Sequence, residues 1–93
     1  MRHFIIVKFK DSVDVHKLVE PIENLFRESL NIHGINRVEF YTSNVNMHNR
    51  YDLMIEMILS REALEKFDNS EIHKKWKINY GEYIESKAIF DCD

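Results

Sequence analysis

The chain has 93 residues, enough for one domain, and its 44% hydrophobic and 31% charged content is typical of a globular protein rather than a disordered one. No apolar run approaches the roughly 20 residues that cross a bilayer, and the first residues lack the apolar core of a signal peptide, so we expect a cytoplasmic protein. The net charge of −3 gives no broad attraction to nucleic acid, and the single cysteine, Cys92, excludes an internal disulfide.

The opening stretch, residues 2–10, has the pattern of a strand that is apolar on both faces. Side chains alternate along a strand, so one face carries His3, Ile5, Val7 and Phe9, and the other carries Phe4, Ile6, Lys8 and Lys10. Such a strand needs a cover on each side, and a chain of this length supplies enough helix for only one. We therefore predict a homodimer in which a second copy covers the face bearing Phe4 and Ile6.

Apolar residues recur at helical spacing over residues 15–30, which predicts a helix that covers the other face of the sheet. Pro21 interrupts this pattern, because a proline inside a helix costs about 3 kcal/mol. It predicts either a kink or a separate first turn before a helix that begins near Pro21. Gly34 is the residue expected to stop the helix.

Three more strands are predicted over residues 35–42, 51–59 and 83–91. The asparagine-rich residues 43–50 predict a loop. On the last strand, Ile84, Ala88 and Phe90 are expected to share one face.

Two short helices are predicted between the third and fourth strands. Ser60 is the expected N-cap of the first, the polar residues 68–71 break it, and the second runs from Ile72 to about Tyr80 and stops at Gly81. The order of elements predicts an α+β, ferredoxin-like split β-α-β domain over residues 1–93. It would have a four-stranded antiparallel sheet with helices on one face.

Three stretches of the chain form an ordered combination: His3-Phe4-Ile5-Ile6-Val7-Lys8-Phe9-Lys10, Tyr51-Asp52-Leu53 and Phe67-Asp68-Asn69-Ser70-Glu71-Ile72-His73. Together they resemble the stress-responsive α/β-barrel (Dabb) domain family, and the resemblance runs essentially from end to end. It implies that the sheets of two subunits pack face to face as a dimeric α+β barrel. It also implies a role associated with stress.

The family's helix-break-helix pattern is Tyr-x-x-His-Pro-x-His, and this sequence keeps only its last histidine, His73. Phe67 stands at the tyrosine, Ser70 at the first histidine and Glu71 at the proline. The resemblance implies that members which cyclise polyketide chains use the tyrosine and the last histidine in a pocket between sheet and helices. Phe67 has no phenolic hydroxyl to polarise a carbonyl, so only the role of His73 carries over.

His3 and His73 are the candidate catalytic residues, because histidine titrates near neutrality and can move a proton for a rate factor of about 10² to 10⁴. We expect both to face a pocket between the helices and the sheet. Its predicted lining is Ile5, Val7, Ile22, Leu25, Phe67, Ile72 and Trp76. In the alternative, purely structural reading, His3 only makes a hydrogen bond near the end of the sheet, and His73 caps its helix or faces solvent.

Other histidines and a lysine-rich stretch do not predict a further site. His16, His33 and His48 are scattered without the spacing of a ligand pair, so no metal site is expected. Related dimeric barrels include haem enzymes with one histidine ligand, but one histidine is weak evidence and we expect no cofactor. In residues 73–77, the lysines fall on the solvent side of a helix while Trp76 turns inward, which favours a solvated face over a nucleic-acid site.

Two classes of function remain open at this point. The first is a small-molecule-binding homodimer without catalysis, with an apolar ligand in each subunit. The second is a cofactor-independent enzyme, of the cyclase, isomerase or monooxygenase kind, in which His73 is the general base and His3 its partner.

Overall fold

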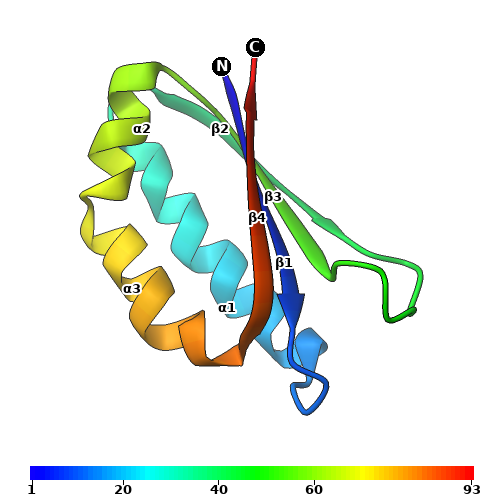
Figure 1. Ribbon diagram of the computed structural model, residues 1–93. Coiled ribbons are helices and arrows are strands. Elements are labelled where there is room, and N and C mark those ends of the chain that lie inside the picture. The colour runs from blue at the N-terminus through cyan, green and yellow to red at the C-terminus, as the bar shows by residue number, and fades with distance from the viewer.

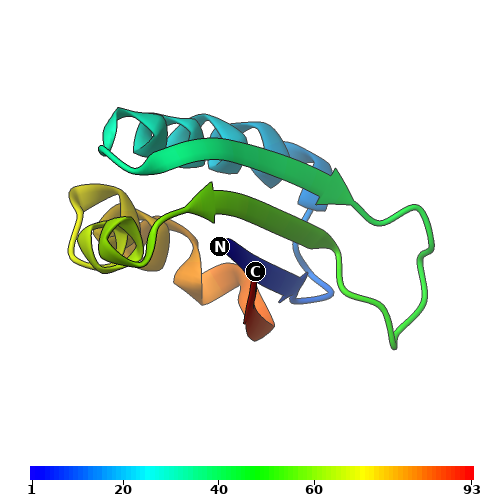
Figure 2. The same ribbon diagram turned by 90° about the horizontal axis from the view of Figure 1, so that it is seen from above.

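Four strands form one antiparallel sheet in the order β2-β3-β1-β4 in the computed structural model, which describes residues 1–93. The strands are β1 (Arg2–Phe9), β2 (Ile35–Thr42), β3 (Leu53–Leu59) and β4 (Ile84–Cys92). The helices are α1 (Val15–Arg27), α2 (Arg61–Asp68) and α3 (Glu71–Tyr80), with 3₁₀ turns η1 (Glu28–Asn31) and η2 (Gly81–Tyr83). All three helices lie on one face of the sheet (Figures 1 and 2), which confirms the predicted ferredoxin-like α+β fold.

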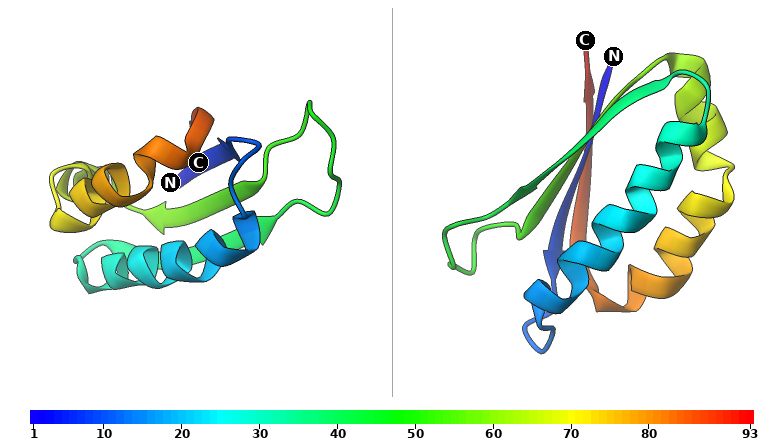
Figure 3. Two further views of the ribbon diagram at one scale, coloured as in Figure 1. Left: turned by 90° about the horizontal axis from the view of Figure 1, so that it is seen from below. Right: turned by 180° about the vertical axis from the view of Figure 1, so that it is seen from behind.

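The core lies between the helices and the inner face of the two central strands. Buried side chains on this inner face are His3, Ile5, Val7 and Phe9 of β1, and Leu53, Ile55, Met57 and Leu59 of β3. From the helices, the ring of Phe26 packs 5.8 Å from that of Phe67 and 5.1 Å from that of Trp76, between ring centres. α1 and α3 run side by side above these residues (Figure 3). No helix is both long and apolar enough to span a membrane.

Helix α1 is continuous through Pro21, so the predicted separate first turn is wrong. Pro21 is exposed, while Ile22, Leu25 and Phe26 on the other side of the helix are buried. The burial of that apolar face offsets the one hydrogen bond that proline cannot make. The helix ends at Arg27 and η1 follows, so Gly34 does not stop the helix.

Gly34 instead forms the turn into β2, with φ at +97°. This backbone conformation favours glycine, because a side chain would meet its own backbone. A Cβ atom at this position would also lie 2.8 Å from Oγ of Ser60. Ser60 accepts a hydrogen bond from the Ala63 backbone N–H at 3.1 Å, which confirms its predicted role as the N-cap of α2.

In the last strand, β4, the side chains that share a face differ from those predicted. Ile84 pairs with Phe9 and packs against the core, whereas Ala88 and Phe90 lie on the outer face, away from the helices. A register shift beside Phe9 puts one extra residue into β4 and reverses the alternation of its side chains. The prediction that Ile84, Ala88 and Phe90 share a face is therefore wrong.

The outer face of the sheet has no cover within the chain. Its apolar side chains are Phe4, Ile6, Met54, Ile58, Ala88 and Phe90. Phe90 is 60% exposed, and its ring centre lies 6.3 Å from that of Phe4. The first strand, β1, is thus apolar on both faces, as predicted, and the helices cover only one face of the sheet.

Candidate functional site

His3 and Asp91 meet at one end of the sheet. The antiparallel register of β1 and β4 sets the two residues opposite each other, and Nδ1 of His3 lies 2.5 Å from Oδ1 of Asp91. His3 is only 6% exposed, while the Asp91 side chain is 42% exposed. A carboxylate at Nδ1 fixes the orientation and tautomer of an imidazole, which leaves Nε2 free to accept a proton or a ligand hydrogen bond. No buried side-chain nitrogen lacks a partner, so Nε2 of His3 is within reach of solvent.

A hollow of about 330 Å³ lies beside this pair. It is lined by Met1, Arg61, Asp91, Cys92 and Asp93. Its size is at the lower end of small-ligand sites, and it presents the guanidinium group of Arg61 together with carboxylates. Asp91 therefore links a nearly buried imidazole to a small polar hollow.

His73 lies in the first turn of α3, half-buried against Phe67. The two ring centres are 5.3 Å apart in an edge-on arrangement, and the His73 backbone N–H donates to Oγ of Ser70 at 3.2 Å. Burial lowers the pKa of His73, and the charges of Lys77 and Lys87 lower it further, while Asp68 opposes them. A lowered pKa keeps the imidazole neutral at pH 7, which is the form that can act as a base.

The two histidines have different partners. His3 is bonded to Asp91, and His73 packs on Phe67. The hollow beside Asp91 includes neither histidine. The contributions of Asp91 and Arg61 were not predicted from the sequence. The only signal for Asp91 was its place at the end of the last strand, which an antiparallel pairing with β1 brings next to His3.

The residues predicted to line a pocket form a packed cluster. Buried members are Ile5, Val7, Ile22, Leu25, Phe67 and Trp76, and Ile72 is half-buried. Phe67 is 0% and Trp76 is 2% exposed. Both rings belong to the buried core between the helices and the sheet.

A second hollow, of about 1160 Å³, lies at the other end of the sheet, between α1 and residues 42–48. Its lining is mainly polar and includes His16 and His48, two of the scattered histidines. No three histidine, cysteine or carboxylate side chains are grouped where they could hold a metal ion.

Comparison with known proteins identifies the fold. No family model and no curated protein sequence matches the chain. Among solved structures, a dabb family protein with a ferredoxin-like fold from Mesorhizobium loti superposes with a TM-score of 0.68 at 15% identity, over 99% of this chain and 93% of that one. The chain has the Dabb-type ferredoxin-like fold.

Two further solved structures superpose on the chain. One is a dimeric protein from Bacteroides fragilis, with a TM-score of 0.71 and 23% identity over 99% of this chain and 93% of that one. The other is a hydroxynitrile lyase from Passiflora edulis, with a TM-score of 0.74 and 14% identity over 96% of this chain and 87% of that one. The fold therefore occurs both in a dimer and in an enzyme.

Proposed function

We propose that this protein is a Dabb-family homodimer that binds a small molecule at the end of the sheet where His3 and Asp91 meet. The observation that carries the proposal is the hydrogen-bonded, nearly buried imidazole whose carboxylate partner lines a hollow of about 330 Å³. A polar pair of this kind fixes the orientation of a ligand, and a hollow of that size has room for a small one. Arg61 supplies a hydrogen-bond donor for a polar group of the ligand.

The uncovered outer face supports the homodimer. It exposes apolar side chains of three strands, and the Bacteroides fragilis protein of the same fold is dimeric. Sedimentation velocity is expected to show a dimer for the wild type and a folded monomer for Ile6→Glu. Ile78→Glu, on the exposed side of α3, is the matched control and should stay dimeric. A wild type that stays monomeric at high concentration contradicts the homodimer.

A thermal-shift screen with small-molecule libraries tests the ligand site. A ligand at 100 times its dissociation constant stabilises the folded state by about 2.7 kcal/mol, enough to raise the melting temperature measurably. The shift should be lost in His3→Ala and in Asp91→Asn but kept in His73→Ala. Loss in His73→Ala alone would place the ligand at His73 instead of at the His3–Asp91 pair, and a screen without hits counts against binding.

A second candidate is a cofactor-independent enzyme in which His73 is the general base. It is favoured by the lowered pKa of His73 and by the hydroxynitrile lyase of the same fold. Removal of a proton next to a carbonyl can be followed by NMR as deuterium exchange into a panel of ketones. His73→Ala should lower the exchange rate by a factor of about 10² to 10⁴. Exchange no faster than in buffer would exclude this activity for the ketones in the panel.

A further inference from the structure

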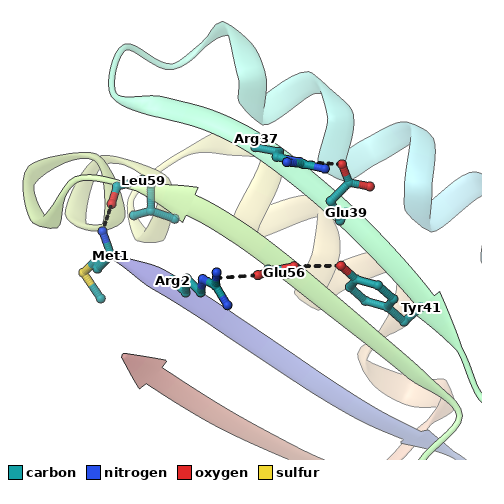
Figure 4. A network of polar contacts seen from close by, with 7 residues as sticks. All are labelled: Met1, Arg2, Arg37, Glu39, Tyr41, Glu56 and Leu59. Carbon is teal, nitrogen blue, oxygen red and sulfur yellow. Dashed lines mark hydrogen bonds and ion pairs between the residues drawn. The ribbon is translucent and has the colours of Figure 1, made fainter. Parts of the chain in front are cut away.

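The outer face of the sheet carries a polar network around Glu56 (Figure 4). Glu56 lies on the central strand β3 and is only 8% exposed, although the outer face has no cover within the chain. One carboxylate oxygen, Oε1, accepts a hydrogen bond from the Tyr41 hydroxyl at 2.8 Å. This bond raises the pKa of Tyr41.

The other carboxylate oxygen has unused hydrogen-bonding capacity. Oε2 of Glu56 lies 3.7 Å from Nε of Arg2, which is an ion-pair distance but too long for a hydrogen bond. No buried side-chain oxygen in the protein lacks a partner, so Oε2 keeps its contact with water. Any molecule that covers this face removes that water, and a carboxylate oxygen left without a donor is costly.

Arg2 also has unused capacity. Its side chain is 55% exposed, and its guanidinium group has five N–H donors but only the loose contact with Glu56. The neighbouring charged pair on β2 is already joined by a hydrogen bond, since Nε of Arg37 donates to Oε1 of Glu39 at 2.7 Å. Arg2 and Glu56 are therefore a cation and an anion on this face whose hydrogen-bonding capacity is not fully used within the chain.

The pairing registers place these charges in rows across the sheet. Arg2 and Arg37 both lie opposite Ile58 and form one row. Glu39 lies opposite Glu56, which in turn lies opposite Phe4, so these three residues form the adjacent row. A cationic row thus lies directly beside an acidic one, and both are bordered by apolar side chains. A partner that fits this face must be apolar and must carry a donor for a carboxylate.

We propose that the partner is a second copy of this chain and that Arg2 of each subunit donates to Glu56 of the partner subunit. This inference rests on the homodimer proposed above. A two-fold axis makes every such contact occur twice, so one pair of residues satisfies both subunits. Bonds from a guanidinium group to a carboxylate are among the stronger ones in proteins, and they fix which surfaces associate.

Charge exchange between two variants tests this contact by sedimentation velocity and native mass spectrometry. Arg2→Glu and Glu56→Arg, each alone, should self-associate at least about 100-fold more weakly than the wild type, because two like charges then face each other. An equimolar mixture should form a heterodimer with a dissociation constant within about tenfold of the wild-type value. Lys75→Glu and Glu65→Arg make the same changes of charge on exposed helical positions and should leave the dimer unchanged.

The outcomes separate this inference from the homodimer itself. A monomeric wild type overturns both. A dimeric wild type whose Arg2→Glu variant associates equally well, or whose two variants stay apart when mixed, overturns only the contact between Arg2 and Glu56.

Circular dichroism confirms that each variant is folded. If Glu56→Arg does not fold, Glu56→Gln takes its place, since it keeps the size of the side chain and removes the charge. Unchanged self-association of Glu56→Gln would overturn the contact.

Discussion

Nδ1 of His3 lies 2.5 Å from Oδ1 of Asp91, across the pairing of the first strand with the last. The two residues are 88 positions apart in the sequence, and only the antiparallel register of β1 and β4 brings them together. The contact serves both the fold, by tying the end of β4 to the centre of the sheet, and the proposed site, by orienting a nearly buried imidazole. Its removal should therefore affect stability as well as binding.

Asp91→Asn is expected to lower the free energy of unfolding by about 0.5–1.5 kcal/mol. This is the range for an ordinary hydrogen bond and lies below that for bonds to charged groups, because Asp91 is partly exposed and screened by water. Urea unfolding at pH 7 measures this loss. Asp93→Asn is the matched control: Asp93 lines the same hollow and makes no hydrogen bond to His3. Equal losses in the two variants would show that the hydrogen bond to His3 adds nothing to the free energy of unfolding.

The lowered pKa of His73 makes stability depend on pH. The folded pKa lies below the ordinary value of 6.5, so the unfolded chain binds more protons between the two pKa values. This contribution to stability is complete above pH 6.5 and is lost as the pH falls through the folded pKa. The wild type should therefore lose more stability than His73→Gln between pH 7.5 and pH 5. Urea unfolding at both pH values and an NMR titration of His73 check this; parallel losses would contradict it.

The two glycines should respond in opposite directions to alanine. Gly34→Ala places a Cβ atom 2.9 Å from that of Ala63 at a φ of +97°, and we expect a loss of about 1–3 kcal/mol. Gly81→Ala adds a Cβ atom in open space on a helical backbone, and a gain of about 0.4–1 kcal/mol is expected from the lower entropy of the unfolded chain. Thermal unfolding of both variants gives the comparison, and a stable Gly34→Ala would contradict the strained turn.

Phe67 should prove to be a core residue as well as a neighbour of His73. Phe67→Ala removes a fully buried ring that packs on Phe26, so a loss of about 3–5 kcal/mol is expected. Ile78→Ala, at a side chain that is 78% exposed on α3, should change stability by less than about 0.5 kcal/mol. Denaturant unfolding measures both. A small loss for Phe67→Ala would mean that the ring borders a space into which its neighbours can collapse.

Several features could be read from the sequence because they depend on local order. Alternation in residues 2–9 and helical spacing around Leu25 and Phe26 gave the strand, the helix and the inward faces. Ser60 could be assigned as a cap because a capping hydroxyl acts within three residues of its own position. The prediction for β4 failed because a bulge beside Phe9 depends on how two strands pair, and a single extra residue reverses every face beyond it.

By itself, the sequence determined the element order, the two-sided apolar first strand and the histidines that deserve testing, since each follows from residue type and spacing along the chain. Only the tertiary structure decided that His3 pairs with Asp91 and that Glu56 keeps one oxygen open on the outer face. It also showed that Phe67 and Trp76 are buried in the core between sheet and helices. The physical reason is that these contacts join positions far apart in the chain, and their distances are set by strand register and side-chain packing, which no local pattern records.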